Sequence, residues 1–452
     1  MSPLLLPNPH SRFILPRAAA SSLTPAPETP RAVVVGAGLA GLAAAVHLHS
    51  AGFPFVLLEA SDAVGGRVRT DRHDGFLLDR GFQILLTAYP EARRLLDLPA
   101  LRPQPFFPGA LVFHSGSFHR LADPFRLPLA ALPTLPNPIG SIPDKLLVGV
   151  ARLRAASIPD DLLLSAPETT IADRLRSSGF SSSIIDRFFR PFLAGIFFDS
   201  DLSTTSRLFD FVFRCLALGD NALPADGIGA IPSQLASRLP SSSLRLQSRV
   251  SAIDPGFPPS VSLHSGDAII ADMGVIVAVE QPEAEKLLPL VLKTRTENKP
   301  ARSTVCIYFS ANRAPISKPV LILNGSGEGI VNNMFFPTNV APSYGPDGKT
   351  LVSVSLVGEY NEQSDEDLRA EVVKELGGWF GSEEVGLWEH LKTYRIGFAQ
   401  PDQTPPTDLT GKNPRVADGV YVCGDHWASA TFDGALVSGR RAAEALIEDL
   451  KR

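Results

Sequence analysis

The sequence predicts an α/β fold organised around one strand–turn–helix–strand unit near the N-terminus. The β-branched run 33–35 is typical of a buried strand. The Ala- and Leu-rich segment 42–51 favours helix, and Gly52 follows it at a position where helices commonly end. The apolar run 55–58 predicts a second strand, which leads directly into Glu59.

Three glycines between the first strand and the helix predict a phosphate-binding turn. Gly36 allows a tight turn, Gly38 lets a pyrophosphate approach the backbone, and Gly41 lets the helix lie close to the sheet. The phosphates would rest on N–H groups at the start of the helix, where the dipole favours negative charge. Glu59 follows about 20 residues later and can accept hydrogen bonds from the ribose hydroxyls of an adenosine. The unit therefore predicts a dinucleotide site.

Length and composition limit the other possibilities. The 452 residues are enough for about two or three domains with a large core, and 44% hydrophobic residues indicate a globular protein. A net charge of -5 argues against a general nucleic-acid binder. Cys215, Cys306 and Cys423 lie far apart, which predicts no metal site and no disulfide framework and suits a reducing compartment. The longest apolar runs are shorter than about 18 residues, so we predict no transmembrane helix.

Residues 1–30 have the composition of an organelle-targeting segment. They contain Arg12 and Arg17 but no acidic residue before Glu28, together with several serines and alanines. This pattern is typical of a transit peptide and favours a chloroplast or other plastid over a mitochondrion. The alternative is a disordered tail with no targeting role.

A second glycine motif follows the predicted ribose-binding acid. Gly65 and Gly66 allow the backbone to pass close to a ligand, and Arg67 can meet phosphate charge. The alternative is a glycine hairpin that carries surface arginines.

The middle of the chain has a different composition. Within 84–224, proline-rich loops alternate with helical stretches, and 165–179 predicts a helix with Thr169 or Thr170 as its cap. The segment 184–213 is dense in phenylalanine. It can form an ordinary aromatic core, the wall of an apolar substrate tunnel, or a membrane-docking face.

The last part of the chain repeats the strand–glycine–helix pattern. Strands expected at 244–250, 261–264, 268–271 and 275–279 look like a return to the first sheet. Near the C-terminus, the strand 419–425 ends in Gly424 and Asp425, and Gly434 and Ala435 then lead into a helix over 438–446. Asp425 can bond a polyol or a phosphate, so the C-terminus is expected to close the cofactor site.

Together these motifs resemble the flavin-containing amine oxidase, phytoene desaturase and protoporphyrinogen oxidase superfamily. The matching pieces are 36–41 with Glu59, 65–67, 225–232 with Val250, and 424–425 with 434–435. The resemblance implies a discontinuous Rossmann-like FAD-binding domain, a mixed α+β substrate domain, and FAD as the cofactor. The FAD-binding residues it implies are Gly36, Ala37, Gly38, Leu39, Ala40, Gly41, Glu59, Ala60, Gly65, Gly66, Arg67, Val250, Gly424, Asp425, Gly434 and Ala435.

The same resemblance implies how the chain divides. The expected segments are 1–30 as transit peptide, 31–85, 225–285 and 415–452 as FAD-binding domain, and 86–224 and 286–414 as substrate domain.

Two departures favour the desaturase side over the amine oxidase side. The strand 303–308 contains no lysine where amine oxidases carry one, because Lys299 lies earlier in the chain. The stretch 430–432 ends in Phe432, where the aromatic cage of amine oxidases would have a tyrosine. We therefore expect a desaturase or oxidase that moves a hydride from an apolar substrate, isoprenoid- or carotenoid-like or a tetrapyrrole, to the flavin N5 atom. Oxygen or a quinone would reoxidise the flavin. Peripheral membrane contact is an open expectation, and no metal or nucleic acid is expected.

Alternatives to this function are an amine oxidase, and an FAD-dependent isomerase or non-catalytic flavoprotein. No pairing of a histidine with a carboxylate stands out as a general base, so the catalytic residues stay unassigned. His426 and Trp427 follow Asp425 and either face the flavin or pack as an ordinary loop.

Overall fold

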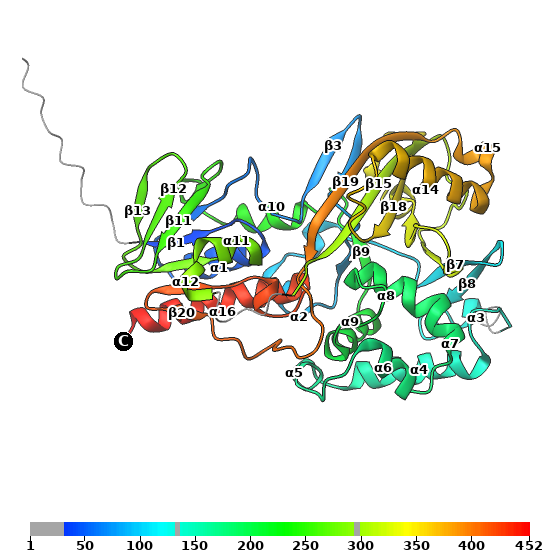
Figure 1. Cartoon of the computed structure of the whole chain (residues 1–452), viewed down its shortest axis with the longest axis horizontal. Helices are drawn as coiled ribbons and strands as arrows, with labels where there is room; N and C mark the ends of the chain where they lie inside the picture. Colours follow the sequence, from blue (N-terminus) through cyan, green and yellow to red (C-terminus); the bar gives the residue numbers. More distant parts are fainter. Residues whose placement is uncertain (1–30, 132–135, 293–298) are drawn as a thin grey trace, which may run out of the picture.

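The fold is that of a computed structural model, which describes residues 31–131, 136–292 and 299–452 (Figure 1). The targeting segment expected at 1–30 lies outside these residues. Two sheets form the framework, with a layer of helices beside the second sheet. The α/β class predicted from the sequence is confirmed.

The first sheet has six strands in the order β10-β2-β1-β14-β21-β20. Its five neighbouring strands from β10 to β21 are parallel, and Val34 in β1 lies between Leu57 in β2 and Ile276 in β14. The strands are β1 (Ala32–Val35), β2 (Phe55–Leu58), β10 (Leu244–Arg245), β14 (Val275–Val277), β20 (Arg415–Ala417) and β21 (Val420–Val422).

Alternate residues of these strands point to opposite faces of the sheet, and both faces are buried. Val34 and Leu57 face α1 (Leu39–Ser50), α10 (Ala230–Ala236) and α16 (Phe432–Leu450). Val33 and Val56 face a layer built from β11 (Val250–Asp254), β12 (Ser260–Leu263), β13 (Ala268–Ile270), α11 (Gln281–Leu287) and α12 (Pro289–Leu292).

The expectation that all strands of 244–279 join the first sheet is wrong. Only β10 and β14 do so, while β11, β12 and β13 pair with each other as a separate antiparallel sheet. Their residues are buried on one side only, which suits an antiparallel layer with one face in solvent. The predicted strand 244–250 accordingly divides into β10 and the start of β11.

The second sheet has seven strands in the order β19-β15-β18-β17-β16-β7-β8. One face packs on α14 (Asp365–Phe380) and α15 (Ser382–Val385) through Val305, Met334 and Val354. The strands are β7 (Gly109–His114), β8 (Ser117–Ala122), β15 (Arg302–Ala311), β16 (Leu321–Asn324), β17 (Asn333–Phe335), β18 (Thr350–Val357) and β19 (Glu389–Gln400).

Helices from residues 142–218 lie beside the second sheet (Figure 1). They are α4 (Ile142–Ser157), α5 (Asp160–Leu164), α6 (Ile171–Ser177), α7 (Ser182–Ile184), a π-helical turn (Ile185–Phe189), α8 (Arg190–Phe197) and α9 (Ser206–Leu218). Shorter elements complete the fold: β3 (Thr70–His73), β4 (Phe76–Asp79), β5 (Leu85–Leu86), β6 (Gln104–Pro105), β9 (Asn221–Leu223), α2 (Pro90–Leu95), α3 (Pro128–Ala131) and α13 (Pro337–Val340).

The helix predicted over 165–179 is shorter than expected. Thr170 is its cap, because the Thr170 side chain accepts a hydrogen bond from the Asp173 N–H, and α6 therefore starts at Ile171. The preceding residues are held outside the helix by Glu168, whose carboxylate accepts a hydrogen bond from the Thr407 N–H at 3.0 Å.

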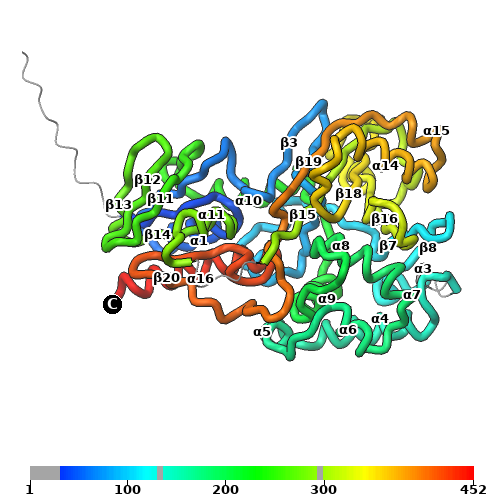
Figure 2. The backbone as a smooth tube through the Cα atoms, in the orientation of Figure 1, coloured from blue at the N-terminus to red at the C-terminus, as the bar shows by residue number. Residues whose placement is uncertain are grey.

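The two ends of the described chain meet through α1 and α16 (Figure 2). A Cβ added at Gly439 in α16 would overlap the Ala40 carbonyl oxygen of α1. The two helices therefore approach each other closely only because residue 439 is glycine.

We predict that Gly439→Ala destabilises the protein by about 2 kcal/mol or more, because the new methyl group has no space between α1 and α16. Urea unfolding followed by circular dichroism measures the change. Gly378→Ala is the matched control, because Gly378 is exposed in α14 and an added Cβ would meet no described atom within 4 Å. It should stabilise by up to ~1 kcal/mol through helix propensity. Equal stability of Gly439→Ala and the parent protein would contradict the close-packing argument.

Candidate functional site

A cavity of about 730 Å³ lies between the two sheets. Its lining includes the turn after β1, the loop after β2, the loop after β21, and parts of β15, β17, α8 and α9. Segments far apart in the sequence therefore share one cavity of the size common for ligand sites.

The glycine turn presents bare backbone to this cavity. Gly36 has a φ of +98°, which favours glycine, and a Cβ on Gly41 would overlap the Gly36 carbonyl oxygen. A Cβ on Gly38 would meet no described atom within 4 Å, so this position opens into the cavity. Gly38 is the N-cap of α1, and no side chain of the described residues caps the helix there. The first turn of α1 also has no acidic residue. The positive end of the helix dipole is therefore available to an anion.

Glu59 lies beside the glycine turn, and 8% of its surface is exposed. Its Oε2 accepts a hydrogen bond from the Ala37 N–H at 2.7 Å, and its Oε1 accepts from the Ser61 N–H and hydroxyl at 2.9 and 2.6 Å. A carboxylate has about four acceptor positions, so at least one remains for a ligand hydroxyl.

An ion pair joins the second glycine motif to the C-terminal strand. Arg67 donates a hydrogen bond to Asp425 at 2.8 Å and another to the Ala399 carbonyl at 2.8 Å. Burial alone would lower the pKa of Arg67, but the adjacent carboxylate of Asp425 raises it above its usual value. Burial alone would raise the pKa of Asp425, and the Arg67 charge lowers it well below its ordinary range. Both groups therefore stay charged.

Two further polar residues line this part of the cavity and were missed from the sequence. Burial raises the pKa of Glu280 above its ordinary value, although the Arg67 charge opposes this effect. Gln83 donates to the Arg67 and Arg80 carbonyls, and its buried Oε1 has no partner among the described residues. A buried acceptor without a partner is uncommon in native proteins and requires an explanation.

Most residues predicted to bind a cofactor lie on this cavity wall. They are Gly36, Gly38, Leu39, Ala40, Glu59, Ala60, Gly65, Gly66, Arg67, Val250, Gly424, Asp425 and Ala435. Ala37, Gly41 and Gly434 lie behind the wall instead, where Ala37 bonds Glu59 and Gly434 packs on the Ser429 carbonyl.

The cavity wall is also rich in phenylalanine. The lining includes Phe82, Phe106, Phe107, Phe192, Phe197 and Phe198. All the phenylalanines of 184–213 are buried or half-buried. The segment therefore supplies core and cavity wall, and the expectation of a membrane-docking face at this segment is wrong.

The flavin containing amine oxidoreductase profile matches residues 39–447. The chain belongs to this family. It is 24% identical over 467 residues to 15-cis-phytoene desaturase, chloroplastic/chromoplastic, of Capsicum annuum, covering 94% of this chain and 79% of that protein. It is 29% identical over 445 residues to hydroxysqualene dehydroxylase of Rhodopseudomonas palustris, covering 92% and 97%. The fold matches an oxidoreductase structure from Methanosarcina mazei at a TM-score of 0.69, with 16% identity and coverage of 93% and 100%.

The family assignment makes the protein a flavin-dependent oxidoreductase and confirms the superfamily resemblance. In this oxidoreductase, the cavity residue from β15 is Thr304, whose hydroxyl donates to the Leu356 carbonyl at 2.7 Å. Among the described lining residues there is no lysine, and Lys299 donates to the Pro406 carbonyl at 3.2 Å.

His426 and Trp427 lie outside the cavity lining of the oxidoreductase. The His426 ring is 4% exposed and packs against Gly424, where an added Cβ would come within 2.6 Å of it. Trp427 packs behind the first sheet. The burial of both residues favours the packed-loop alternative.

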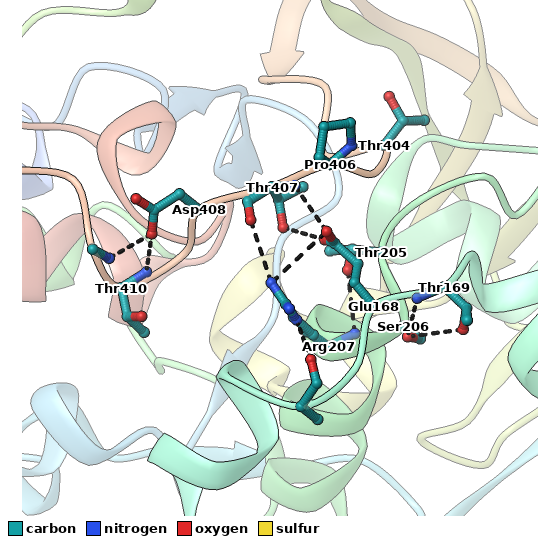
Figure 3. Close-up of polar contacts among 12 residues, drawn as sticks. Glu168, Thr169, Thr205, Ser206, Arg207, Thr404, Pro406, Thr407, Asp408 and Thr410 are labelled. Atoms are coloured by element: carbon teal, nitrogen blue, oxygen red, sulfur yellow. Dashed lines mark hydrogen bonds and ion pairs between the residues drawn. The ribbon is translucent and has the colours of Figure 1, made fainter.

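A polar cluster behind the cavity holds the long connection between β19 and β20 (Figure 3). Glu168 accepts from Thr407, and Arg207 donates to the Thr407 carbonyl at 3.3 Å. Burial alone would raise the pKa of Glu168, but the hydrogen bonds from Thr407 lower it below its ordinary value. Nearby, Gln403 accepts from the N–H of Ala430, a cavity residue, at 3.3 Å. The cluster thus positions part of the wall.

Asp79 is a buried carboxylate that joins the β3–β4 hairpin to the loop before α10. It accepts hydrogen bonds from the Thr70 hydroxyl at 2.6 Å, the Ile228 N–H at 3.0 Å and the Tyr344 hydroxyl at 2.8 Å. Burial raises the pKa of Asp79 to about 6, because these hydrogen bonds only partly offset the loss of water.

Within the described residues, no group of three or more His, Cys, Asp or Glu side chains is arranged to hold a metal ion. Of the helices in the described ranges, none combines the length and apolar character that crossing a bilayer requires.

The raised pKa of Asp79 predicts a pH-dependent stability. The folded state holds a proton that the unfolded state loses above about pH 4. Stability relative to Asp79→Asn should therefore fall by roughly 2 kcal/mol as the pH rises from 4.5 to 7.5. The asparagine can keep all three contacts, since its amide N–H can donate to the Tyr344 hydroxyl. Urea unfolding at each pH measures the difference.

Asp71→Asn is the control for this series. Burial alone would raise the pKa of Asp71, but hydrogen bonds from Arg80 and Tyr394 lower it to about 2. The Asp71 carboxylate stabilises the fold fully above the pKa it has in the unfolded chain, and this effect is lost only as the pH falls toward about 2. The stability difference between the parent protein and Asp71→Asn should therefore be nearly constant from pH 4.5 to 7.5. A flat difference for Asp79→Asn as well would contradict the pKa assigned to Asp79.

Proposed function

We propose that this oxidoreductase uses FAD to oxidise an apolar substrate. The observation that carries the proposal is the shared cavity, whose wall includes the bare glycine turn, the Arg67–Asp425 pair and several phenylalanines. When bound, FAD supplies a two-electron acceptor at its N5 atom.

The residues present fit this cofactor. Gly38 and the start of α1 would hold the pyrophosphate, with Arg67 within reach of its charge. Glu59 would accept from the adenosine ribose, and Val250 would lie against the adenine. Asp425, Gly424 and the start of α16 would hold the remaining polar part of the cofactor, with the two acceptor oxygens of Asp425 available to hydroxyl groups.

We also propose that the chain divides as the motifs indicate. The segments 31–85, 225–285 and 415–452 form the FAD-binding domain, since the strands of the first sheet come from them. The segments 86–224 and 286–414 form the substrate domain, since they supply the second sheet and the helices α4 to α9.

The substrate proposed is isoprenoid- or carotenoid-like, or a tetrapyrrole. Six phenylalanines line the cavity, which suits an extended apolar molecule. Phytoene and hydroxysqualene stand in the names of two relatives. A hydride would leave a substrate C–H bond for the flavin N5 atom, and oxygen or a quinone would take the electrons from the reduced cofactor.

Two alternatives remain. An amine oxidase would be expected to carry the lysine typical of such enzymes, and the described cavity lining contains no lysine, which counts against this alternative. An isomerase or non-catalytic flavoprotein would show no net flavin reduction. Anaerobic mixing with carotenoid precursors, porphyrinogens and amines decides between them. Bleaching by an apolar compound supports the proposal, bleaching by amines alone supports the first alternative, and no bleaching supports the second.

We predict that Gly38→Val weakens FAD binding more than about tenfold while the protein stays folded, because a Cβ at this position meets no described atom within 4 Å and the side chain would point into the cavity. Chromatography of the flavin released from purified protein identifies it as FAD and gives its stoichiometry. Gly378→Val, at an exposed position of α14, is the control and should retain the cofactor. Full FAD content in Gly38→Val would remove the turn from the binding site.

We propose that the protein acts in a plastid and meets a membrane there through α4. The relative from Capsicum annuum is named as chloroplastic/chromoplastic; a mitochondrial location is the alternative. The outward face of α4 exposes Ile142, Leu146, Val150 and Leu153 by 54%, 65%, 60% and 53%. Their spacing places them in one stripe along the helix.

Charge and position both favour an anionic lipid surface as the partner of this stripe. The charged residues of α4 are Lys145, Arg152, Arg154 and Asp144; Asp144 is buried and Arg152 forms an ion pair with Asp123 at 3.1 Å, so the net positive charge of the helix comes from Lys145 and Arg154. Arg152 donates to the Ala217 carbonyl at 3.0 Å, and the neighbouring Leu216 lines the cavity. An apolar substrate dissolved in a bilayer would therefore lie close to the cavity wall.

We predict that Leu146→Asp with Val150→Asp lowers co-sedimentation with anionic lipid vesicles on the order of a hundredfold, since each buried side chain contributes roughly 1.5–3 kcal/mol. Leu387→Asp is the control, because Leu387 is 70% exposed but lies after α15. Binding that survives the double substitution, or that falls equally with Leu387→Asp, would exclude α4 as the docking face.

A further inference from the structure

The strand β17 turns alternate side chains toward the two faces of the second sheet. Met334 packs into the core beneath α14. Phe335 faces the other way, toward the cavity, where its ring lies 5.0 Å from that of Phe82 and 5.4 Å from that of Phe106. Asn333 stands two positions before Phe335 and lines the cavity on the same face.

The Asn333 amide is buried without a full set of partners. The residue is 1% exposed, and its Oδ1 has no hydrogen-bond partner among the described residues. Its neighbours differ: Asn332 donates to the Pro191 carbonyl at 2.9 Å, and Asn324 donates to the Val331 carbonyl at 2.8 Å. Buried amide oxygens in native proteins are almost always paired, so this one requires an explanation.

The surroundings of the amide point to a ligand rather than to a packing fault. Gly195 in α8 faces it across the cavity wall, and a Cβ at that position would lie 2.6 Å from the Asn333 Nδ2 atom. The absence of a side chain at residue 195 therefore leaves room for the amide. Nearby lining residues of α8 and β16 are apolar, namely Phe192, Ile196 and Leu321. The amide is thus a polar point in an apolar wall.

We propose that Asn333 determines specificity by accepting a hydrogen bond from a hydroxyl or amine group on an otherwise apolar substrate. The proposal rests on the proposed function, because it assumes that the substrate occupies the phenylalanine-lined part of the cavity. A substrate lacking that donor would leave the Asn333 oxygen unpaired in the complex, so the site would discriminate against the plain hydrocarbon.

Three probes with one carbon skeleton test this recognition: farnesol, its methyl ether, and the hydrocarbon lacking oxygen. Calorimetric titration of the holoenzyme, in one detergent and without oxygen, gives the affinities. Farnesol should bind about tenfold more tightly than the other two, because only its hydroxyl can donate. Equal affinity for farnesol and the ether in the parent protein would overturn the proposal without any variant.

Asn333→Leu should abolish the preference by weakening farnesol binding while leaving the hydrocarbon unchanged or tighter. Asn332→Leu is the matched control and should keep the preference, since its amide bonds the Pro191 carbonyl rather than facing the cavity. Thermal unfolding separates recognition from folding. Asn333→Leu should be at least as stable as the parent protein because no paired group is lost, and Asn332→Leu should be less stable. A preference that persists in Asn333→Leu would overturn the proposal.

The outcome is independent of turnover. If farnesol is preferred but no apolar compound reduces the flavin, the proposed reaction fails while the recognition by Asn333 stands. If apolar compounds reduce the flavin but no preference is measured, only the role of Asn333 fails.

Discussion

The close contact between α1 and α16 is the constraint on which the site depends. Each helix follows a strand of the first sheet, β1 or β21, and these two strands lie on either side of β14. Parallel strands end at the same edge of a sheet, so both helices start beside the cavity. Because residue 439 is glycine, its helix can lie against the Ala40 carbonyl. This packing sets how far the glycine turn lies from Asp425.

The charges in the site follow from the same arrangement. Arg67 is held from three sides, by the Asp425 carboxylate, the Ala399 carbonyl and the face of Phe398, 5.3 Å away. A partly buried ion pair of this kind contributes little net stability but fixes geometry. The positive end of α1 then favours a ligand's anionic group, while Glu59 and Asp425 offer acceptors to its hydroxyl groups. A ligand with a charged centre and polyol arms on both sides matches this pattern.

The cavity wall around the glycine turn could be predicted because the features that form it are local in the sequence. A phosphate turn needs glycine at set positions, and a buried parallel strand needs an unbroken apolar run, so 33–41 carries both signals. Predictions failed where distant contacts override local preference. The helix expected over 165–179 starts late because Glu168 bonds Thr407 from the far side of the chain. The strands β11 to β13 have ordinary alternation, and nothing local says which sheet they join.

The part of the cavity wall around Asn333 could not be predicted, because it depends on strand register rather than on a sequence motif. Asn332 and Asn333 are the same residue type in adjacent positions, yet one bonds a helix carbonyl and the other faces the cavity. A shift of one residue in β17 would exchange these roles. The opposing position, Gly195, comes from a helix more than a hundred residues earlier in the sequence. Because β17 and α8 belong to neither the first sheet nor its helices, their residues can change without disturbing the glycine turn. Substrate preference in this fold can therefore vary while the cofactor site stays the same.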